Sequence, residues 1–220
     1  MTSESSIIQS PHLVDAESFS PFPADCPATQ TEYMEVICND VNWEEAAIAG
    51  VTFDSAVFQK AKLARSIMRD TTLRDVSIAK SDLSNADWIG TSWQAVGVFS
   101  TRLTGFNGSE GSFRDVTCRG CTGKFALLHS AKCERCVFEK CDLSDATFEN
   151  ASLKSVTFRD CNLTNVRFLW STLEAVDLRG SNIQGLQIDV QNLRSVTIDP
   201  MQTTAIATLT GVTIEGLEES

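Results

Sequence analysis

Residues 141–165 read CDLSDATFENASLKSVTFRDCNLTN, and every fifth position from the third onward carries a large apolar side chain. These positions are Leu143, Phe148, Leu153, Phe158 and Leu163. The residue two places before each of them is small or β-branched: Cys141, Ala146, Ala151, Val156 and Cys161. Self-similarity at a fixed period overrides local secondary-structure propensity, so the fold prediction starts from this five-residue pattern.

The same phase extends over most of the chain. Stepping by five from Trp43 to Ile198, every position is large and apolar except Gly108, Cys118, Gly123 and Cys133. Residues 97–123 are rich in glycine and place Phe106 where a small side chain is the rule. We therefore expect 97–123 to be the least regular part of the repeat.

A five-residue period fits neither the 3.6-residue repeat of a helix nor the two-residue repeat of a strand, so the chain must turn once per repeat. Four such sides close a square coil of about 20 residues, in which large and small side chains alternate inward and fill a narrow lumen. Successive coils stack through backbone hydrogen bonds roughly 4.8 Å apart. Residues 41–198 thus predict an all-β solenoid of about eight coils.

Several segments resemble the A(D/N)LxX motif of the pentapeptide repeat proteins. They are Ser81–Asn85 (SDLSN), Ala86–Trp88 (ADW), Cys141–Asp145 (CDLSD), Cys161–Asn165 (CNLTN) and Val176–Gly180 (VDLRG). The resemblance covers about residues 41–198. It implies a right-handed quadrilateral β-helix, a handedness that the period alone does not supply.

The two ends of the chain depart from the repeat. Residues 1–40 form an acidic, Pro-containing segment, and we expect a short capping helix over Glu32–Ala47 before the first coil. Residues 199–220 predict a C-terminal helix and tail, because Asp199 can act as N-cap and Pro200 fits the first turn. The apolar residues of this helix are Met201, Ala205, Ile206 and Leu209, with Gly211 as a stop. They either seal the core or join two copies, and the resemblance favours a homodimer formed through this end.

Four cysteines have the spacing of a zinc site, as Cys118-x2-Cys121 followed by Cys133-x2-Cys136. The repeat phase gives another interpretation. Cys118 and Cys133 occupy large inward positions and Cys121 and Cys136 occupy small inward positions, so all four thiols point into the lumen. We expect structural thiols here, with no metal and no other cofactor.

One face of the predicted rod places apolar residues at outward positions. They are Ile67, Ile89, Leu127, Leu169, Trp170 and Val190. The neighbouring face carries mixed charges and is expected to be solvated. An apolar stripe on a polar rod marks a contact surface, which takes a protein partner, a second copy, or residues 1–40 folded back over it.

Composition excludes several classes of function. The chain has two histidines, His12 and His129, and neither has a Ser, Cys or Asp partner in phase with the repeat, so we expect no enzyme. No apolar run is long enough to cross a bilayer, and the N-terminus lacks the basic and apolar regions of a signal peptide. These features predict a cytoplasmic protein with reduced cysteines.

The net charge of -11 argues against direct binding of nucleic acid and is compatible with mimicry of it. Well-studied members of the family that this chain resembles protect DNA gyrase from inhibitors by presenting a rod of duplex-like width and negative potential. The resemblance therefore implies a non-enzymatic protein that modulates gyrase by DNA mimicry, with antibiotic resistance as the consequence. The alternative is a scaffold with no topoisomerase role. The acidic excess lies before residue 60 and after 198, whereas residues 60–198 hold more basic than acidic side chains.

Overall fold

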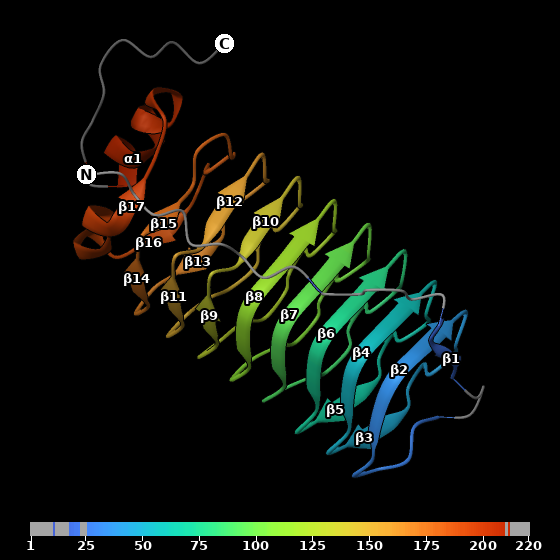
Figure 1. Cartoon of the computed structure of the whole chain (residues 1–220). Helices are drawn as coiled ribbons and strands as arrows, with labels where there is room; N and C mark the ends of the chain where they lie inside the picture. The colour runs from blue at the N-terminus through green and yellow to red at the C-terminus, as the bar shows by residue number, and fades with distance from the viewer. Residues whose placement is uncertain (1–10, 12–17, 23–25, 210, 212–220) are drawn as a thin grey trace, which may run out of the picture.

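The structure, a computed structural model, describes residues 11, 18–22, 26–209 and 211. These residues form a right-handed quadrilateral β-helix of about nine turns with a short helix at its C-terminal end (Figure 1). Every strand pair is parallel and joins residues one coil apart; Phe53 pairs with Leu73, and Trp93 with Phe113. The five-residue period therefore builds coils of four sides, as the sequence predicted.

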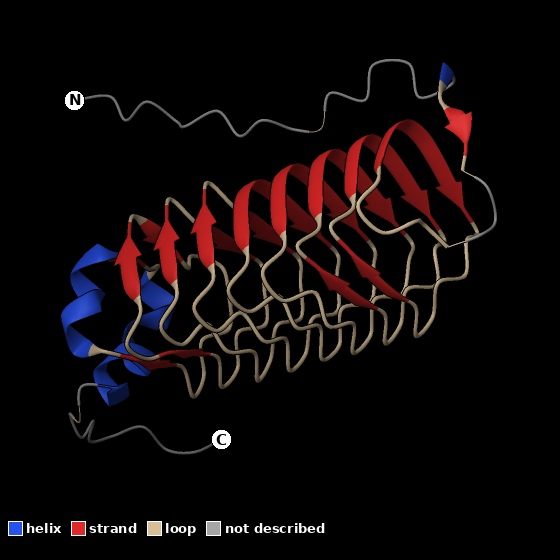
Figure 2. Ribbon diagram, turned by 90° about the horizontal axis from the view of Figure 1, so that it is seen from below, coloured by secondary structure: helices blue, strands red, loops and turns tan. Residues whose placement is uncertain are grey.

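A 13-stranded parallel sheet covers two adjacent sides of the rod, and its long strands give way to pairs of short ones toward the C-terminal end (Figure 2). The long strands wrap around one corner, whereas the later coils break at that corner. The strands are β1 (Ser20–Pro21), β2 (Glu32–Asn39), β4 (Thr52–Gln59), β6 (Thr72–Ala79), β7 (Ser92–Phe99), β8 (Ser112–Arg119), β9 (Lys132–Glu134), β10 (Val137–Glu139), β11 (Ser152–Lys154), β12 (Thr157–Arg159), β14 (Thr172–Glu174), β15 (Val176–Asp177) and β17 (Val196–Thr197).

A third side carries two short sheets, one at each end of the rod. They are β3 (Ala47–Ala49) with β5 (Ile67–Arg69), and β13 (Arg167–Phe168) with β16 (Gln187–Ile188). Isolated parallel bridges such as Ile67↔Asp87 and Leu127↔Thr147 continue the same ladder between them. The predicted apolar stripe lies on this side.

The corners explain how the chain can turn every five residues. Each corner residue has a positive φ, for example Asn85 at 54°, Asp145 at 59° and Gly105 at 67°. Asn and Asp tolerate this left-handed conformation better than other side chains, and glycine adopts it freely. Polar residues therefore recur at the turns, and the large apolar residues stay in the middle of each side.

Small polar residues inside the lumen satisfy backbone groups near the corners. Ser81 donates its hydroxyl to the carbonyl of Ala79 at 2.9 Å and accepts the N–H of Ala61 at 3.0 Å. The thiol of Cys121 points to the carbonyl of Val98 at 3.4 Å. Ser81, Thr101, Cys121, Cys141, Cys161 and Ser181 share one inward column, because each is small enough for the site and can donate a hydrogen bond there.

Residues 97–123 are regular, so the expectation of an irregular stretch is wrong. The ladder passes through Gly97, which pairs with Ser77 and Thr117. Phe106 is 4 % exposed and fills lumen space beside Gly108, where an added Cβ would lie 2.8 Å from the phenylalanine ring. Large and small residues have exchanged places within one side, which conserves the volume of the core.

The expected capping helix over Glu32–Ala47 is also wrong. Residues Glu32–Asn39 form β2, which pairs along its length with β4. Tyr33 and Cys38 continue the five-residue phase of Trp43 toward the N-terminus, so the coils begin before the expected boundary at residue 41. This extra coil accounts for about nine turns instead of the expected eight.

Aromatic side chains close the N-terminal end of the lumen. Phe22 follows β1 and packs edge-on against Tyr33 and Trp43, with ring centroids 4.8 and 5.1 Å apart. Phe22 is 8 % exposed and Trp43 is 2 % exposed. The described residues of the predicted N-terminal segment therefore include part of the cap; residues 1–10, 12–17 and 23–25 lie outside the described residues.

The C-terminal helix begins where the sequence predicted. Asp199 accepts the N–H of Met201 at 2.9 Å and donates its own N–H to the Gln202 side chain at 2.9 Å, which completes a capping box. The helical segments at this end are η2 (Val190–Ser195), η3 (Pro200–Gln202) and α1 (Thr203–Leu209). Gly211, with φ of 79°, follows as a stop.

Candidate protein-binding surface

The structure places all six residues of the predicted stripe on one side of the rod and exposes four of them strongly. The exposed fractions are 40 % for Ile67, 41 % for Leu127, 67 % for Trp170 and 59 % for Val190. Ile89 and Leu169 are half-buried.

The register of the ladder decides which of these residues are neighbours. Ile67 is bridged to Asp87, and Leu127 lies between Asn107 and Thr147, so polar side chains separate them. Trp170 and Val190, in contrast, occupy the same corner of successive coils, because Phe168 pairs with Ile188. The structure thus brings together Leu169, Trp170 and Val190, which we call the C-terminal apolar patch.

Backbone contacts fix the position of Trp170. Its N–H donates to the Asp189 carboxylate at 2.7 Å, and its φ of 59° places it at a corner. The side-chain amide of Asn192, in η2, donates to the carbonyl of Ser171 at 2.8 Å. The indole is therefore presented outward from a backbone held on both sides. The repeat phase predicts that Trp170 faces outward, but no feature of the sequence indicates the contact of Asp189 with its backbone.

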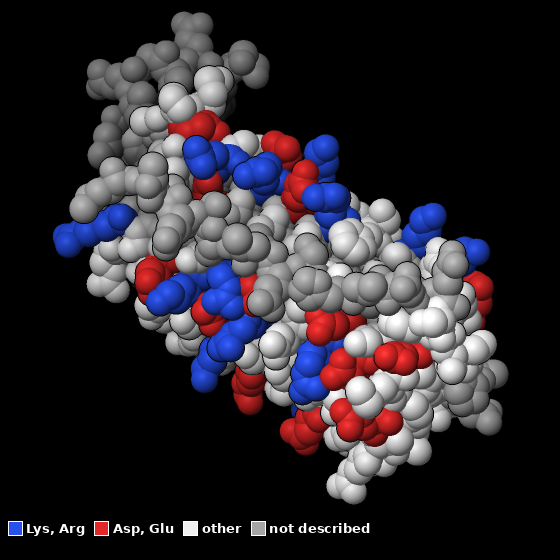
Figure 3. Space-filling view, in the orientation of Figure 1, with Lys and Arg blue, Asp and Glu red and all other residues white. Residues whose placement is uncertain are grey.

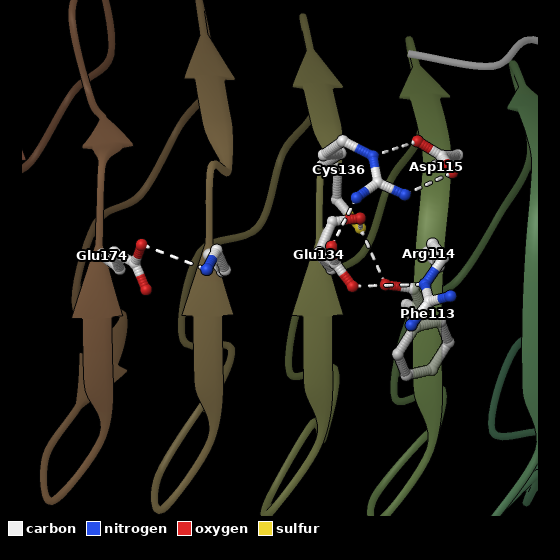
Figure 4. A network of polar contacts seen from close by, with 8 residues as sticks. Phe113, Arg114, Asp115, Glu134, Cys136 and Glu174 are labelled. Carbon is white, nitrogen blue, oxygen red and sulfur yellow. Dashed lines mark hydrogen bonds and ion pairs between the residues drawn. The ribbon is translucent and has the colours of Figure 1, made fainter. Parts of the chain in front are cut away.

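The two sides covered by the large sheet carry ion pairs between successive coils. Figure 4 shows the network around β8 and β9, in which Arg135 pairs with Asp115 through two contacts of 2.7 and 2.8 Å and also contacts Glu134. Arg114 reaches Glu134 at 3.2 Å. The Asp115 carboxylate, which is buried beneath Arg135, raises the pKa of that guanidinium by hydrogen bonding. The side that holds Arg114, Asp115 and Glu134 therefore carries mixed charges, as the sequence predicted, and the structure adds that they form ion pairs between coils.

Acidic side chains without an ion-pair partner gather at the first coil. Glu32, Glu35, Asp40 and Glu44 are exposed and form no ion pair with any described residue; we call them the acidic end. Figure 3 shows acidic side chains clustered near β2 and mixed with basic ones elsewhere on the visible face. Along the coils, pairs such as Arg74–Asp54 and Arg102–Asp82 neutralise the carboxylates. Asp70, Glu110, Asp145 and Asp160 are also exposed without an ion pair among the described residues, but they lie on separate coils. The acidic end differs because several such carboxylates lie together there and no Lys or Arg precedes residue 60.

The four cysteines with zinc-like spacing lie in the lumen. Cys118, Cys121, Cys133 and Cys136 are each 5 % exposed or less, which confirms their inward position. Burial raises the pKa of the Cys118 thiol well above its usual value, which disfavours the thiolate that a metal requires. Among the described residues, no group of three or more His, Cys, Asp and Glu side chains has a metal-binding arrangement.

A groove separates the last coil from the C-terminal helix. Gly180–Gly185 form one wall, and residues of η3 and α1 form the other, around a volume of about 790 Å³. Of the predicted cap or dimer residues, Ala205, Ile206 and Leu209 pack against the core, whereas Met201 is 91 % exposed. We call this feature the C-terminal groove.

Among the described residues, no helix is long and apolar enough to cross a membrane.

Two family models match the chain. The model described as pentapeptide repeats (8 copies) matches residues 38–91, and the model described as pentapeptide repeat region matches residues 131–206. Together they cover more than half of the chain. No curated protein matches it.

Solved structures of pentapeptide-type proteins resemble it at low sequence identity. A structure of QnrB1, a plasmid-mediated fluoroquinolone resistance protein, is 17 % identical, covers 88 % of this chain and 94 % of its own, and superposes with a TM-score of 0.41. HetL, a pentapeptide repeat protein involved in heterocyst differentiation regulation in the cyanobacterium Nostoc, is 14 % identical, covers 73 % of this chain and 86 % of its own, and gives a TM-score of 0.31.

Proposed function

This chain belongs to the pentapeptide repeat family, and we propose that it acts without catalysis, as a rod that holds a protein partner against the C-terminal apolar patch. The observation that carries the proposal is the placement of the tryptophans. Trp43, Trp88 and Trp93 are at most 3 % exposed and fill the lumen, whereas Trp170 is 67 % exposed. Tryptophan is enriched at the energetic centres of protein interfaces because it buries a large rigid surface.

We expect Trp170→Asp to weaken partner binding by about 30-fold or more, since loss of an interface tryptophan typically costs at least about 2 kcal/mol. The measurement is quantitative capture from native lysate of the host organism, followed by titration of the captured protein against the wild-type chain and the variant.

Phe125→Asp is the matched control for this experiment. Phe125 is 56 % exposed, has the same corner φ of 59° and lies at a different corner from the C-terminal apolar patch. The control should bind like the wild-type chain. Equal binding by the Trp170 variant and the control would contradict the proposed site.

The second candidate is a partner that itself binds DNA, with DNA gyrase as the one that the family resemblance implies. The acidic end favours this candidate, because unpaired carboxylates concentrate negative potential there. The ion pairs along the coils disfavour mimicry by the whole rod.

We expect the protein, at micromolar concentration, to preserve gyrase supercoiling in the presence of a quinolone, and we expect Glu32→Gln with Glu35→Gln to weaken that effect. Both substitutions keep the shape of the side chain and remove its charge. A supercoiling assay in which the wild-type protein neither rescues nor inhibits gyrase would exclude this candidate.

The exposed side chain of Met201 supports self-association through the C-terminal end. Met201 covers no part of the core and is 91 % exposed. Contact with a second copy would bury this apolar side chain. We expect the wild-type chain to be a dimer by light scattering and Met201→Asp to be a monomer of unchanged thermal stability. A monomeric wild-type chain would disprove the dimer.

A further inference from the structure

No further coil follows the last coil of the rod among the described residues. Side chains there supply some of the hydrogen-bond donors and acceptors that the backbone of a further coil would provide. The amide of Gln202 donates to the carbonyls of Leu178 and Ser181, both at 2.7 Å. The carboxylate of Asp199 accepts the N–H of Gly180 at 2.8 Å. These contacts satisfy much of the exposed edge.

Backbone donors on this edge are left over, and two of them lie on the side that faces the C-terminal groove. In the preceding coil the N–H of Leu163 donates to Asn182 at 2.8 Å, and that of Asn165 donates to Gln184 at 2.9 Å. The equivalent donors one coil later, Ile183 and Gly185, have no acceptor among the described residues. Both residues line the C-terminal groove. Donors at alternate residues match the carbonyl spacing of one extended strand.

The chain itself supplies a segment with the sequence of a coil strand. Residues 212–215 read VTIE, and residues 196–199, which contain β17, read VTID. Val212 and Ile214 thus repeat the spacing of the small and large inward positions. Residues 212–220 lie outside the described residues.

The end of α1, which precedes this segment in the sequence, lies at the groove. Leu209, the last residue of α1, lines the groove. Gly211 then turns the chain, with φ of 79° and its N–H bonded to the carbonyl of Thr208 at 3.1 Å. Val212 follows Leu209 by three residues in the sequence, and Leu209 forms the apolar wall of the groove together with Ala205.

We propose that residues 212–216 dock in the C-terminal groove as one more strand, whose carbonyls accept the N–H groups of Ile183 and Gly185. Val212 and Ile214 pack against Ala205 and Leu209. The added strand covers the open edge and so prevents other chains from pairing with it. This inference concerns the end of the rod and is independent of the proposed partner site at Trp170.

Amide hydrogen exchange at Ile183 and Gly185, read by NMR in the full chain, tests the proposal. We expect both amides to be protected in the wild-type chain and to exchange at least about tenfold faster in Ile214→Asp, because a docked strand must open before they exchange. Thr213→Asp is the matched control, since Thr213 alternates with the inward residues, and it should retain the protection. Unchanged thermal melting would show that both variants are folded.

Equal exchange in the wild-type chain and Ile214→Asp would overturn the proposal. Equal loss of protection in the Thr213 control would overturn the assigned register of the strand. Protection that grows with protein concentration would place a second copy in the groove and would overturn docking of the chain's own segment.

Discussion

Phe148→Ala should lower the free energy of unfolding by about 3–5 kcal/mol, because the vacated volume cannot be refilled. Phe148 is 0 % exposed. Its ring stacks on Phe168 at 5.2 Å and meets Phe158 edge-on at 5.9 Å and Phe138 at 6.4 Å. The backbone of each coil is held by its neighbours, so the lumen cannot collapse around the cavity. Chemical denaturation followed by circular dichroism measures the loss.

Phe125→Ala is the control for that measurement, because it removes the same side chain from a site that is 56 % exposed. Its effect should stay within about 0.5 kcal/mol, as for most surface substitutions. If both variants lost the same stability, the ladder of rings in the lumen would not be the main source of stability in this part of the rod.

The fold could be predicted from the sequence because each side of a coil repeats the same physical requirement. The large residues, such as Phe148 and Phe158, mark the middle of a side, and the corner residues between them adopt positive φ. The first coil escaped prediction because Tyr33 and Cys38 carry the phase among acidic residues that also suit a helix. The pairing of β2 with β4 outweighs that local preference.

The candidate site could be predicted only in part. The repeat assigns Ile67, Leu127 and Trp170 to one side, which the structure confirms. The polar residues at the equivalent positions of the coils between them were not considered. Asp87 and Asn107 interrupt the predicted stripe, so among its six residues the apolar neighbours on successive coils are those around Trp170. The contacts at the C-terminal edge could not be predicted from the sequence. They depend on how η3 and α1 pack against the last coil, and the five-residue period carries no information about that packing.

Deleting Ser155 alone should destabilise the rod more than any substitution considered above. Ser155 is a corner residue, with φ of 54°, between the sides centred on Leu153 and Phe158. Its loss removes one turn and shifts the following residues by one place in the pairs that span it, such as Phe138↔Phe158 and Leu153↔Leu173. A one-residue slip turns inward side chains outward. Val156 and Phe158, both 0 % exposed, would then lose their places in the lumen.

We expect this deletion to cost about 5 kcal/mol or more, or to abolish the single cooperative transition, because at least two buried apolar side chains are displaced. The control is a larger deletion, of residues 142–161, which removes a whole coil and joins Cys141 to Asn162 in phase. Because a solenoid is stabilised by contacts between adjacent repeats, the shorter rod should keep its β spectrum and one cooperative melt, at reduced stability. Thermal melts of the two deletions compare them directly. A stable single-residue deletion beside an unfolded whole-coil deletion would show that length, and not phase, determines whether this rod folds.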